Sequence, residues 1–167
     1  WDCDGLGAAL RKQVSDNFVG NDINQFAFKG SHSPDNPLSV YEPTADNAAL
    51  SLTNEDLFRN KRAQYYWDLR DRCYKTYRAV VHKEYIDELE LISFSSDIKQ
   101  IQQLRSEVCR IPRKPNGTGV IQMLSKPEMK TKGIPSPNMA DCIMMSLAIS
   151  DRIVKRKKSK PMRLSIA

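Results

Sequence analysis

Residues 136–147 constrain the fold most, because they place an acidic residue inside an apolar helical pattern. Ser136 is a suitable N-cap and Pro137 suits the first helical position. The apolar residues recur at helical spacing and predict one buried face: Met139, Ile143, Met144 and Leu147. Asp141 lies among them in the first turn, where an unpaired buried carboxylate would be costly. The pattern therefore predicts either a solvent-facing capping residue or a carboxylate stabilised by the helix N-terminus and a bound divalent metal.

The composition is that of an ordinary globular domain. The chain has 167 residues, of which 40% are hydrophobic and 28% charged, which is enough for one domain with its own core. No apolar run approaches the length of a membrane span, and no signal peptide is recognisable. The four cysteines are scattered without a CxxC pair. This spacing indicates neither a zinc site nor a disulfide framework, and it favours a reducing cytoplasm.

The excess positive charge is concentrated at the C-terminus. The net charge is +6, and residues 155–167 contain six basic residues and no acidic one. Removing these six from the 26 basic residues leaves 20, which equals the number of acidic residues. We therefore expect a packed domain over residues 1–154 and a basic tail over 155–167, which has too little apolar surface to offset the entropy of ordering it.

The first residues predict the end of a strand, a tight glycine turn and a helix, as in an α/β unit. Asp2 and Asp4 would share one face near the carboxyl end of that strand, where open α/β sheets carry their sites. An ordinary Asp-Gly turn is the plain alternative, and a calcium loop is a weaker one. Because a domain does not naturally start inside a strand end, we expect further strands upstream. The helix is expected to pack through one apolar face: Leu6, Leu10, Val14 and Phe18.

The middle of the chain is predicted to be largely helical. Residues 24–30 predict a short strand, because Phe26 and Phe28 alternate. Helices are expected over 53–77, with Thr53 as N-cap, over 83–94, and from about 97 onwards. The aromatic residues 65–67 are predicted to be core rather than a base-stacking platform. The basic residues of the helix predicted over 53–77 are expected on a solvated, salt-bridged face: Arg59, Lys61, Arg62, Arg70 and Arg72.

A basic hairpin is predicted before the helix that carries Asp141. Its arms are residues 108–115 and 120–124, with a turn at 116–119. Basic residues cluster on the incoming arm and on the loop that follows: Arg110, Arg113, Lys114, Lys126, Lys130 and Lys132. This cluster predicts a track for nucleic-acid phosphates, and a solubilising edge strand rich in lysine is the alternative.

Four segments together resemble a known family. They are DCDGLGAAL (2–10), FRNKRAQYYWDLR (58–70), LSKPEMK (124–130) and SPNMADC (136–142). In this order they resemble the C-terminal nuclease domain of the large terminase subunit of tailed bacteriophages, of the headful-packaging type. The resemblance covers roughly residues 1–150. It implies an α/β, ribonuclease H-like fold with a mixed central sheet flanked by helices and an added β-hairpin.

The resemblance also implies a function. Members of the family are metal-dependent endonucleases that cleave concatemeric double-stranded DNA with two Mg²⁺ or Mn²⁺ ions. Their site has three carboxylates. Asp2 matches the second and Asp141 the third, Asp4 is a reserve ligand, and the first would lie upstream of this chain. The implied partners are double-stranded DNA, an upstream ATPase domain of the same polypeptide, the terminase small subunit and the portal. The resemblance implies no membrane partner, and it implies that the protein acts in the host cytoplasm.

The residue types suit this chemistry. Two metal ions about 3.5–4 Å apart can activate a water and stabilise the leaving oxygen of a phosphodiester. Hard cations prefer carboxylate oxygen to His or Cys ligands. The expected DNA-contacting residues are Arg110, Arg113, Lys114, Lys126 and Lys130. A non-catalytic DNA-binding or portal-docking module is the alternative function, and it would place Asp2 and Asp141 on opposite faces.

Overall fold

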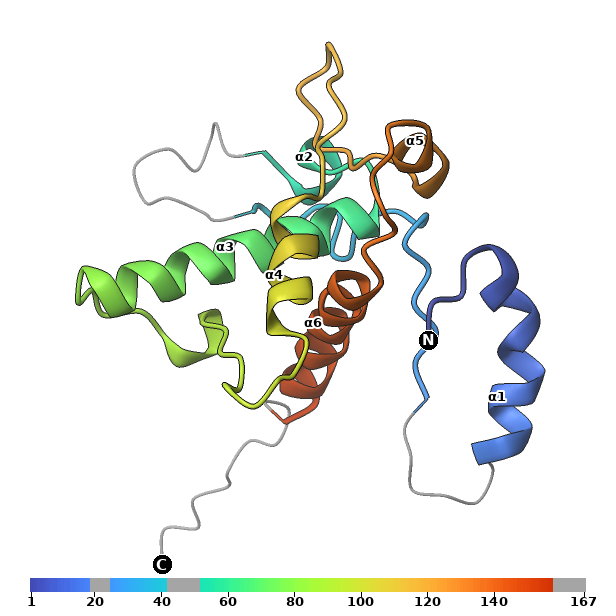
Figure 1. Cartoon of the computed structure of the whole chain (residues 1–167), viewed down its shortest axis with the longest axis horizontal. Helices are drawn as coiled ribbons and strands as arrows, with labels where there is room; N and C mark the ends of the chain where they lie inside the picture. The colour runs from blue at the N-terminus through green and yellow to red at the C-terminus, as the bar shows by residue number, and fades with distance from the viewer. Residues whose placement is uncertain (19–24, 42–51, 158–167) are drawn as a thin grey trace, which may run out of the picture.

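The computed structural model describes residues 1–18, 25–41 and 52–157, with side chains up to residue 148. Figure 1 shows the arrangement of its elements. In chain order they are η1 (Gly5–Leu10), α1 (Arg11–Phe18), α2 (Asn54–Leu57), α3 (Lys61–Val81), η3 (Glu88–Glu90), α4 (Ile101–Cys109), α5 (Lys126–Thr131) and α6 (Asn138–Lys157). No helix in the described ranges is both long enough and apolar enough to cross a bilayer.

The main core forms where α6 packs against α3 and α4. The predicted inward face of α6 is confirmed at Met144 and Leu147, which are buried against Tyr65, Tyr66 and Leu69 of α3. The prediction that residues 65 and 66 are core is confirmed as well. A second, smaller cluster joins the start of α3 to the chain after α4: Phe58, Ala63 and Ile121.

The predicted sheet is not present as continuous strands within the described residues. The β-pairing there consists of four isolated bridges, of which Asp2–Phe28 and Phe58–Ile121 are parallel. The first bridge is supported by Cys3 N–H donating to Phe28 C=O at 2.7 Å. The strand predicted over 24–30 is therefore reduced to this single bridge in the described residues, and Phe28 is buried.

The helix predicted over 53–77 is two helices. Thr53 is the N-cap, as predicted, and forms a capping box with Asp56. Phe58 then adopts an extended conformation, with φ −116° and ψ 132°, which lets its buried ring pack on Ile121. Asn60 starts α3 anew, because its side chain accepts a hydrogen bond from Ala63 N–H.

The prediction of a helix over 83–94 is wrong, because only the short η3 (Glu88–Glu90) is helical there. Lys83 has φ +58° just after α3, which is outside the right-handed helical region. Side chains of α3 satisfy the backbone polar groups that a helix would have paired: Thr76 Oγ1 accepts from Ile92 N–H at 2.9 Å, and Arg72 donates to Leu89 C=O at 2.5 Å. The next helix exists as α4, although it begins at Ile101 rather than near residue 97.

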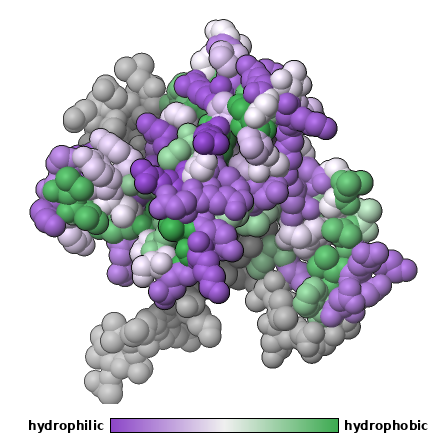
Figure 2. All heavy atoms as spheres, viewed as in Figure 1, coloured by the Kyte–Doolittle hydropathy of each residue, from purple (hydrophilic) through white to green (hydrophobic). Residues whose placement is uncertain are grey.

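The helix predicted after the glycine turn is present as η1 and α1, but its apolar face is not buried against the described residues. Leu6 is 94% exposed, Leu10 and Phe18 are exposed as well, and α1 buries no residue. Figure 1 shows α1 standing apart from the α3–α6 core, and Figure 2 shows apolar side chains on the surface over the same elements. Among the described elements, none covers this face.

The hairpin and the tail differ from prediction at their boundaries. α4 extends through Cys109, so residues 108 and 109 are helical and the paired arms begin near Pro112. Lys114 N–H donates to Gln122 C=O at 2.6 Å, which confirms the antiparallel pairing. α6 continues to Lys157, and residues 158–167 of the predicted tail lie outside the described residues, so the tail stays a prediction.

Candidate metal-binding site

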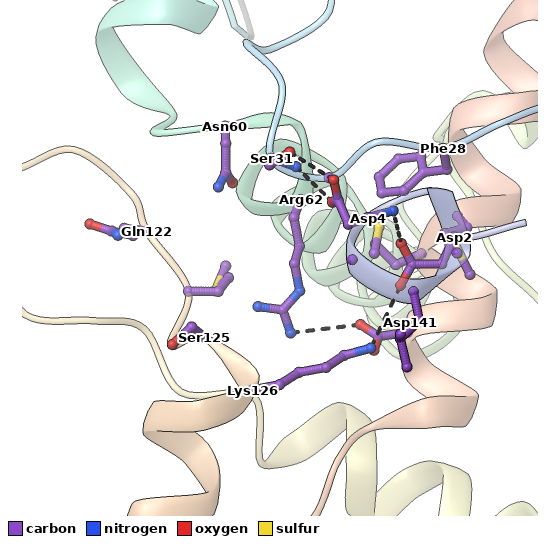
Figure 3. A pocket seen from close by; sticks show the side chains of 17 residues that line it. Asp2, Asp4, Phe28, Ser31, Asn60, Arg62, Gln122, Ser125, Lys126 and Asp141 are labelled. Atoms are coloured by element: carbon purple, nitrogen blue, oxygen red, sulfur yellow. Dashed lines mark hydrogen bonds and ion pairs between the residues drawn. The ribbon is translucent and has the colours of Figure 1, made fainter. Parts of the chain in front are cut away.

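A cavity of about 850 Å³ opens where four parts of the chain meet. Its walls come from the N-terminal turn, the loop after Phe28 with the start of α3, residues 122–126 and the first turns of α6. The predicted carboxylates Asp2, Asp4 and Asp141 all line it (Figure 3). The structure thus brings the two N-terminal aspartates and the α6 aspartate to one cavity.

Asp141 is buried, with 7% of its surface exposed, so of the two alternatives that the α6 pattern left open, the solvent-facing cap is wrong. Its Oδ1 accepts a hydrogen bond from the Tyr66 hydroxyl and lies 3.6 Å from Arg62 Nη2. Its Oδ2 is buried and accepts no hydrogen bond from the described residues. Oδ1 of Asp141 is thus held by Tyr66 and Arg62 of α3, while the only partner of Oδ2 among the described residues is the Lys126 ammonium, 3.3 Å away.

The N-terminus of α6 is capped from another helix. The helix begins at Asn138, one residue later than predicted, and Ser136 does not cap it but donates to Asn138 Oδ1. Glu107 of α4 caps it, since its Oε2 accepts from Met139 N–H at 2.7 Å and from Ala140 N–H at 3.2 Å. A carboxylate is favoured at this end of a helix by the backbone dipoles. Glu107 therefore fixes the turn that carries Asp141.

Lys126 lies between the two predicted ligands. Its Nζ is 3.3 Å from Asp141 Oδ2 and 3.6 Å from Asp2 Oδ2, so one ammonium group contacts both carboxylates (Figure 3). Lys126 is the first residue of α5, whose start is fixed by a capping box between Ser125 and Glu128. Two carboxylate oxygens from opposite ends of the chain thus converge on one cationic group.

Asp2 and Asp4 differ in their surroundings. Asp2 Oδ1 accepts from Asp4 N–H at 3.1 Å, which leaves Oδ2 toward Lys126. Asp4 is held by Ser31, whose N–H and Oγ donate to its carboxylate at 3.0 and 2.7 Å. Gly7 is required here, because a Cβ at this position would lie 1.8 Å from the Asp2 carbonyl oxygen. The glycine turn therefore sets the position of Asp2, and Asp4 braces the loop beside the cavity.

The electrostatics of the site are those of one buried carboxylate, Asp141, and one partly exposed carboxylate, Asp2, both close to cations. Burial and the adjacent Asp141 carboxylate raise the pKa of Tyr66 far above its ordinary value, so the phenol remains a donor. No group of three His, Cys, Asp or Glu side chains is close enough to hold a metal in the described part of the chain. Two converging carboxylates, one with an orphaned buried oxygen, match the hard oxygen donors preferred by Mg²⁺, Mn²⁺ and Ca²⁺.

The predicted DNA-contacting residues lie on the end of α4, the hairpin and α5. Arg113 donates to Gly119 C=O within the hairpin, and Lys114 pairs with Glu128 at 2.5 Å. Arg110 is exposed at the end of α4, and Lys130 is exposed in the last turn of α5. Of the five predicted residues, only Lys126 reaches the carboxylates.

Two residues of the site have a role that differs from the one their sequence pattern predicts. Arg62 was expected on a solvated face, but its guanidinium points into the cavity, and Lys61 beside it is buried with Asp35 at 2.6 Å. Tyr66 was expected only as core. Arg62 and Tyr66 lie four residues apart on one face of α3, and this spacing is the sequence signal that could have linked them.

These features define a class of protein: a helix-rich domain with a carboxylate site suited to a hard divalent cation, in a cavity walled by lysine and arginine. Solved structures narrow the class further. The nuclease domain of the large terminase subunit of bacteriophage Sf6 matches 88% of this chain at 45% identity with a TM-score of 0.78. A lysine-to-alanine variant of that domain, solved with calcium, matches 88% of this chain at 44% identity with a TM-score of 0.78. The same type of variant, solved with manganese and β-thujaplicinol, matches 88% of this chain at 45% identity with a TM-score of 0.75.

The resemblance seen in the sequence is therefore confirmed: the chain is a relative of the nuclease domain of a bacteriophage large terminase subunit. The chain spans 63% of the length of each of these solved chains. No protein-family model and no curated protein sequence matches it.

Proposed function

We propose that this chain is the metal-dependent endonuclease domain of a viral DNA-packaging terminase, and that it cleaves concatemeric double-stranded DNA. The observation that carries the proposal is the convergence of Asp2 and Asp141 on one ammonium group, 3.6 and 3.3 Å away. The related nuclease domains, solved with manganese or calcium, support it. The ribonuclease H-like sheet, the two-ion mechanism and the host cytoplasm belong to the same proposal.

Asp2 and Asp141 would hold the divalent cation through the Oδ2 atoms that now face Lys126. When bound, Mg²⁺ or Mn²⁺ would activate water and stabilise the charge on the leaving oxygen. The residues fit such an ion because Asp141 Oδ2 is buried and lacks a hydrogen-bond donor. Lys126 is about half exposed, so its flexible side chain can leave the carboxylates and contact a phosphate oxygen instead. Asp4 stays the reserve ligand.

DNA would reach this site along the hairpin and α5. Arg110, Arg113 and Lys130 are exposed and carry positive charge without sequence selectivity, as contacts to phosphates require. The upstream ATPase domain, the small subunit and the portal are the further partners we propose, on the basis of the family resemblance. The alternative of a non-catalytic docking module is disfavoured, because it would place Asp2 and Asp141 apart.

The decisive experiment is plasmid digestion with added Mn²⁺, together with Mn²⁺ binding by electron paramagnetic resonance. It is performed on this chain and on a polypeptide extended upstream of Trp1. Asp141→Asn should abolish cleavage while the circular dichroism spectrum and Tm stay close to those of the unaltered protein. Asp16→Asn, on the exposed α1, is the matched control and should cut normally. Cleavage by Asp141→Asn at the unaltered rate would refute the assignment. Asp4→Asn, measured in the same assays, tests whether Asp4 rather than Asp2 is the N-terminal ligand.

A further inference from the structure

We propose that Tyr66, supported by Arg62, is a positioning residue that fixes the Asp141 carboxylate, with Oδ1 held by the protein and Oδ2 presented to the cation. This inference rests on the proposed function, and it assigns a role to two residues of α3 that do not themselves bind the metal.

The inference rests on the different contacts that the two oxygens of the Asp141 carboxylate make. The Tyr66 hydroxyl donates to Oδ1, and Arg62 Nη2 lies 3.6 Å from the same atom. Oδ2 receives no hydrogen bond in the described structure and lies 3.3 Å from the Lys126 ammonium. Figure 3 shows Arg62 and Lys126 approaching Asp141 from the same side of the cavity, at different oxygens. Oδ1 is thus held by two buried residues of α3, whereas Oδ2 is paired only with the half-exposed Lys126 side chain, which a cation can displace.

The anchors are themselves rigid. Tyr66 is buried in the core, with 4% of its surface exposed. Arg62 Nη1 donates to Leu124 C=O at 2.8 Å, and its guanidinium lies 5.1 Å from the centre of the Tyr66 ring. The backbone N–H of Arg62 donates to Gly30 C=O at 2.9 Å. Moving either anchor would therefore disturb the core or the loops that wall the cavity.

A fixed orientation matters because the terminal torsion of an Asp side chain is broad and nearly two-fold. Without the Tyr66 donor, the carboxylate of Asp141 can rotate and direct either oxygen toward Arg62. A cation would then have to select one orientation before binding. Groups that orient metal ligands in this way typically contribute about 10–100-fold to metal affinity.

A matched pair of tyrosines separates positioning from simple stabilisation. Tyr65 is the neighbour of Tyr66 on α3, is buried to the same extent, and donates to a carboxylate outside the site, Asp35 Oδ2 at 2.8 Å. Tyr65→Phe and Tyr66→Phe each remove one hydroxyl that bonds to a carboxylate and keep the ring that packs in the core. A role confined to folding predicts similar consequences for both variants.

The test measures Mn²⁺ affinity by electron paramagnetic resonance and Tm by circular dichroism, for the unaltered chain, Tyr66→Phe, Tyr65→Phe and Asp141→Asn. We expect Tyr66→Phe to weaken Mn²⁺ binding by about 10–100-fold. Tyr65→Phe should leave affinity unchanged, with a comparable change in Tm. Equal affinity in Tyr66→Phe and the unaltered chain would overturn the positioning role, even where Asp141→Asn abolishes binding. Equal affinity in Asp141→Asn and the unaltered chain would overturn the proposed metal site and the inference together.

Discussion

The cap that α4 provides to α6 predicts a measurable loss of stability in Glu107→Ala. Glu107 Oε2 accepts hydrogen bonds from Met139 N–H and Ala140 N–H, at 2.7 and 3.2 Å. The variant leaves both donors without this acceptor and removes a negative charge from a helix N-terminus. Because α6 packs on both α3 and α4, a frayed first turn is expected to weaken the main core.

The magnitude follows from two contributions. Losing an N-cap costs about 0.5–2 kcal/mol, and losing a favourable charge at the helix N-terminus costs about 0.3–1 kcal/mol. We therefore expect Glu107→Ala to lower the free energy of unfolding by about 2 kcal/mol. In a chain of this size, about 2–4 °C is lost per kcal/mol, so Tm should fall by about 4–8 °C. Glu107→Gln keeps an acceptor and should lose less than half of this.

The assay is thermal and urea unfolding followed by circular dichroism. Gln103→Ala is the control, because Gln103 Nε2 donates only to the other oxygen, Glu107 Oε1, at 3.0 Å on the surface of α4. Its effect should stay within about 0.5 kcal/mol. A Tm for Glu107→Ala within 1–2 °C of the unaltered chain, on the order of experimental error, would refute the cap as a stabilising contact.

Two further predictions concern the hairpin and α5. Neutralising the proposed phosphate contacts with Arg113→Gln and Lys130→Gln should make the dependence of log K for DNA on log salt shallower by about 0.9 for each phosphate that is no longer neutralised. Lys114 and the Ser125 cap lower the pKa of Glu128 to about 2. Because this pKa is below its ordinary value, the stability that Glu128 contributes is present above about pH 4.5 and is lost as pH falls toward 2. Lys114→Met should therefore make the free energy of unfolding depend less on pH in this range.

Each of these predictions has its own control. For DNA binding, Lys83→Gln with Lys99→Gln removes two exposed charges far from the hairpin and should leave the salt dependence closer to that of the unaltered chain. An identical salt dependence in the hairpin double variant would exclude Arg113 and Lys130 as contacts. For the acid profile, urea unfolding between pH 5 and 2 is measured with Lys130→Met as control. A profile unchanged by Lys114→Met would show that the ion pair with Glu128 contributes nothing.

Patterns that depend on local chemistry predicted the structure well. The apolar spacing in α6 indicated the buried face, although it left the burial of Asp141 open, and the Thr53 cap marked a helix start that the structure contains. The alternation of Phe26 and Phe28 predicted the segment that pairs with Asp2. In each case the residues involved lie within a few positions of each other, so their spacing alone encodes the outcome.

Features that depend on distant partners were not predictable from spacing. The segment after α3 has a helical apolar pattern, but Thr76 and Arg72 bind its backbone and hold it extended. Arg62 looks like a surface residue in sequence, and only the arrival of Leu124 and Asp141 from later in the chain makes it part of the site. The Glu107 cap likewise joins residues 32 positions apart.

The long sequence separations within the site have a consequence for how the chain folds. The Tyr66–Asp141 contact spans 75 residues and the Arg62–Leu124 contact spans 62, while Asp2 joins residues near the opposite end of the described chain. Such contacts close large loops and form late, because their entropic cost precedes their stabilisation. The carboxylates therefore come together only once most of the chain has reached its native topology. A partly folded chain would hold its acidic residues apart, so the assembly of this carboxylate site would report that folding is complete.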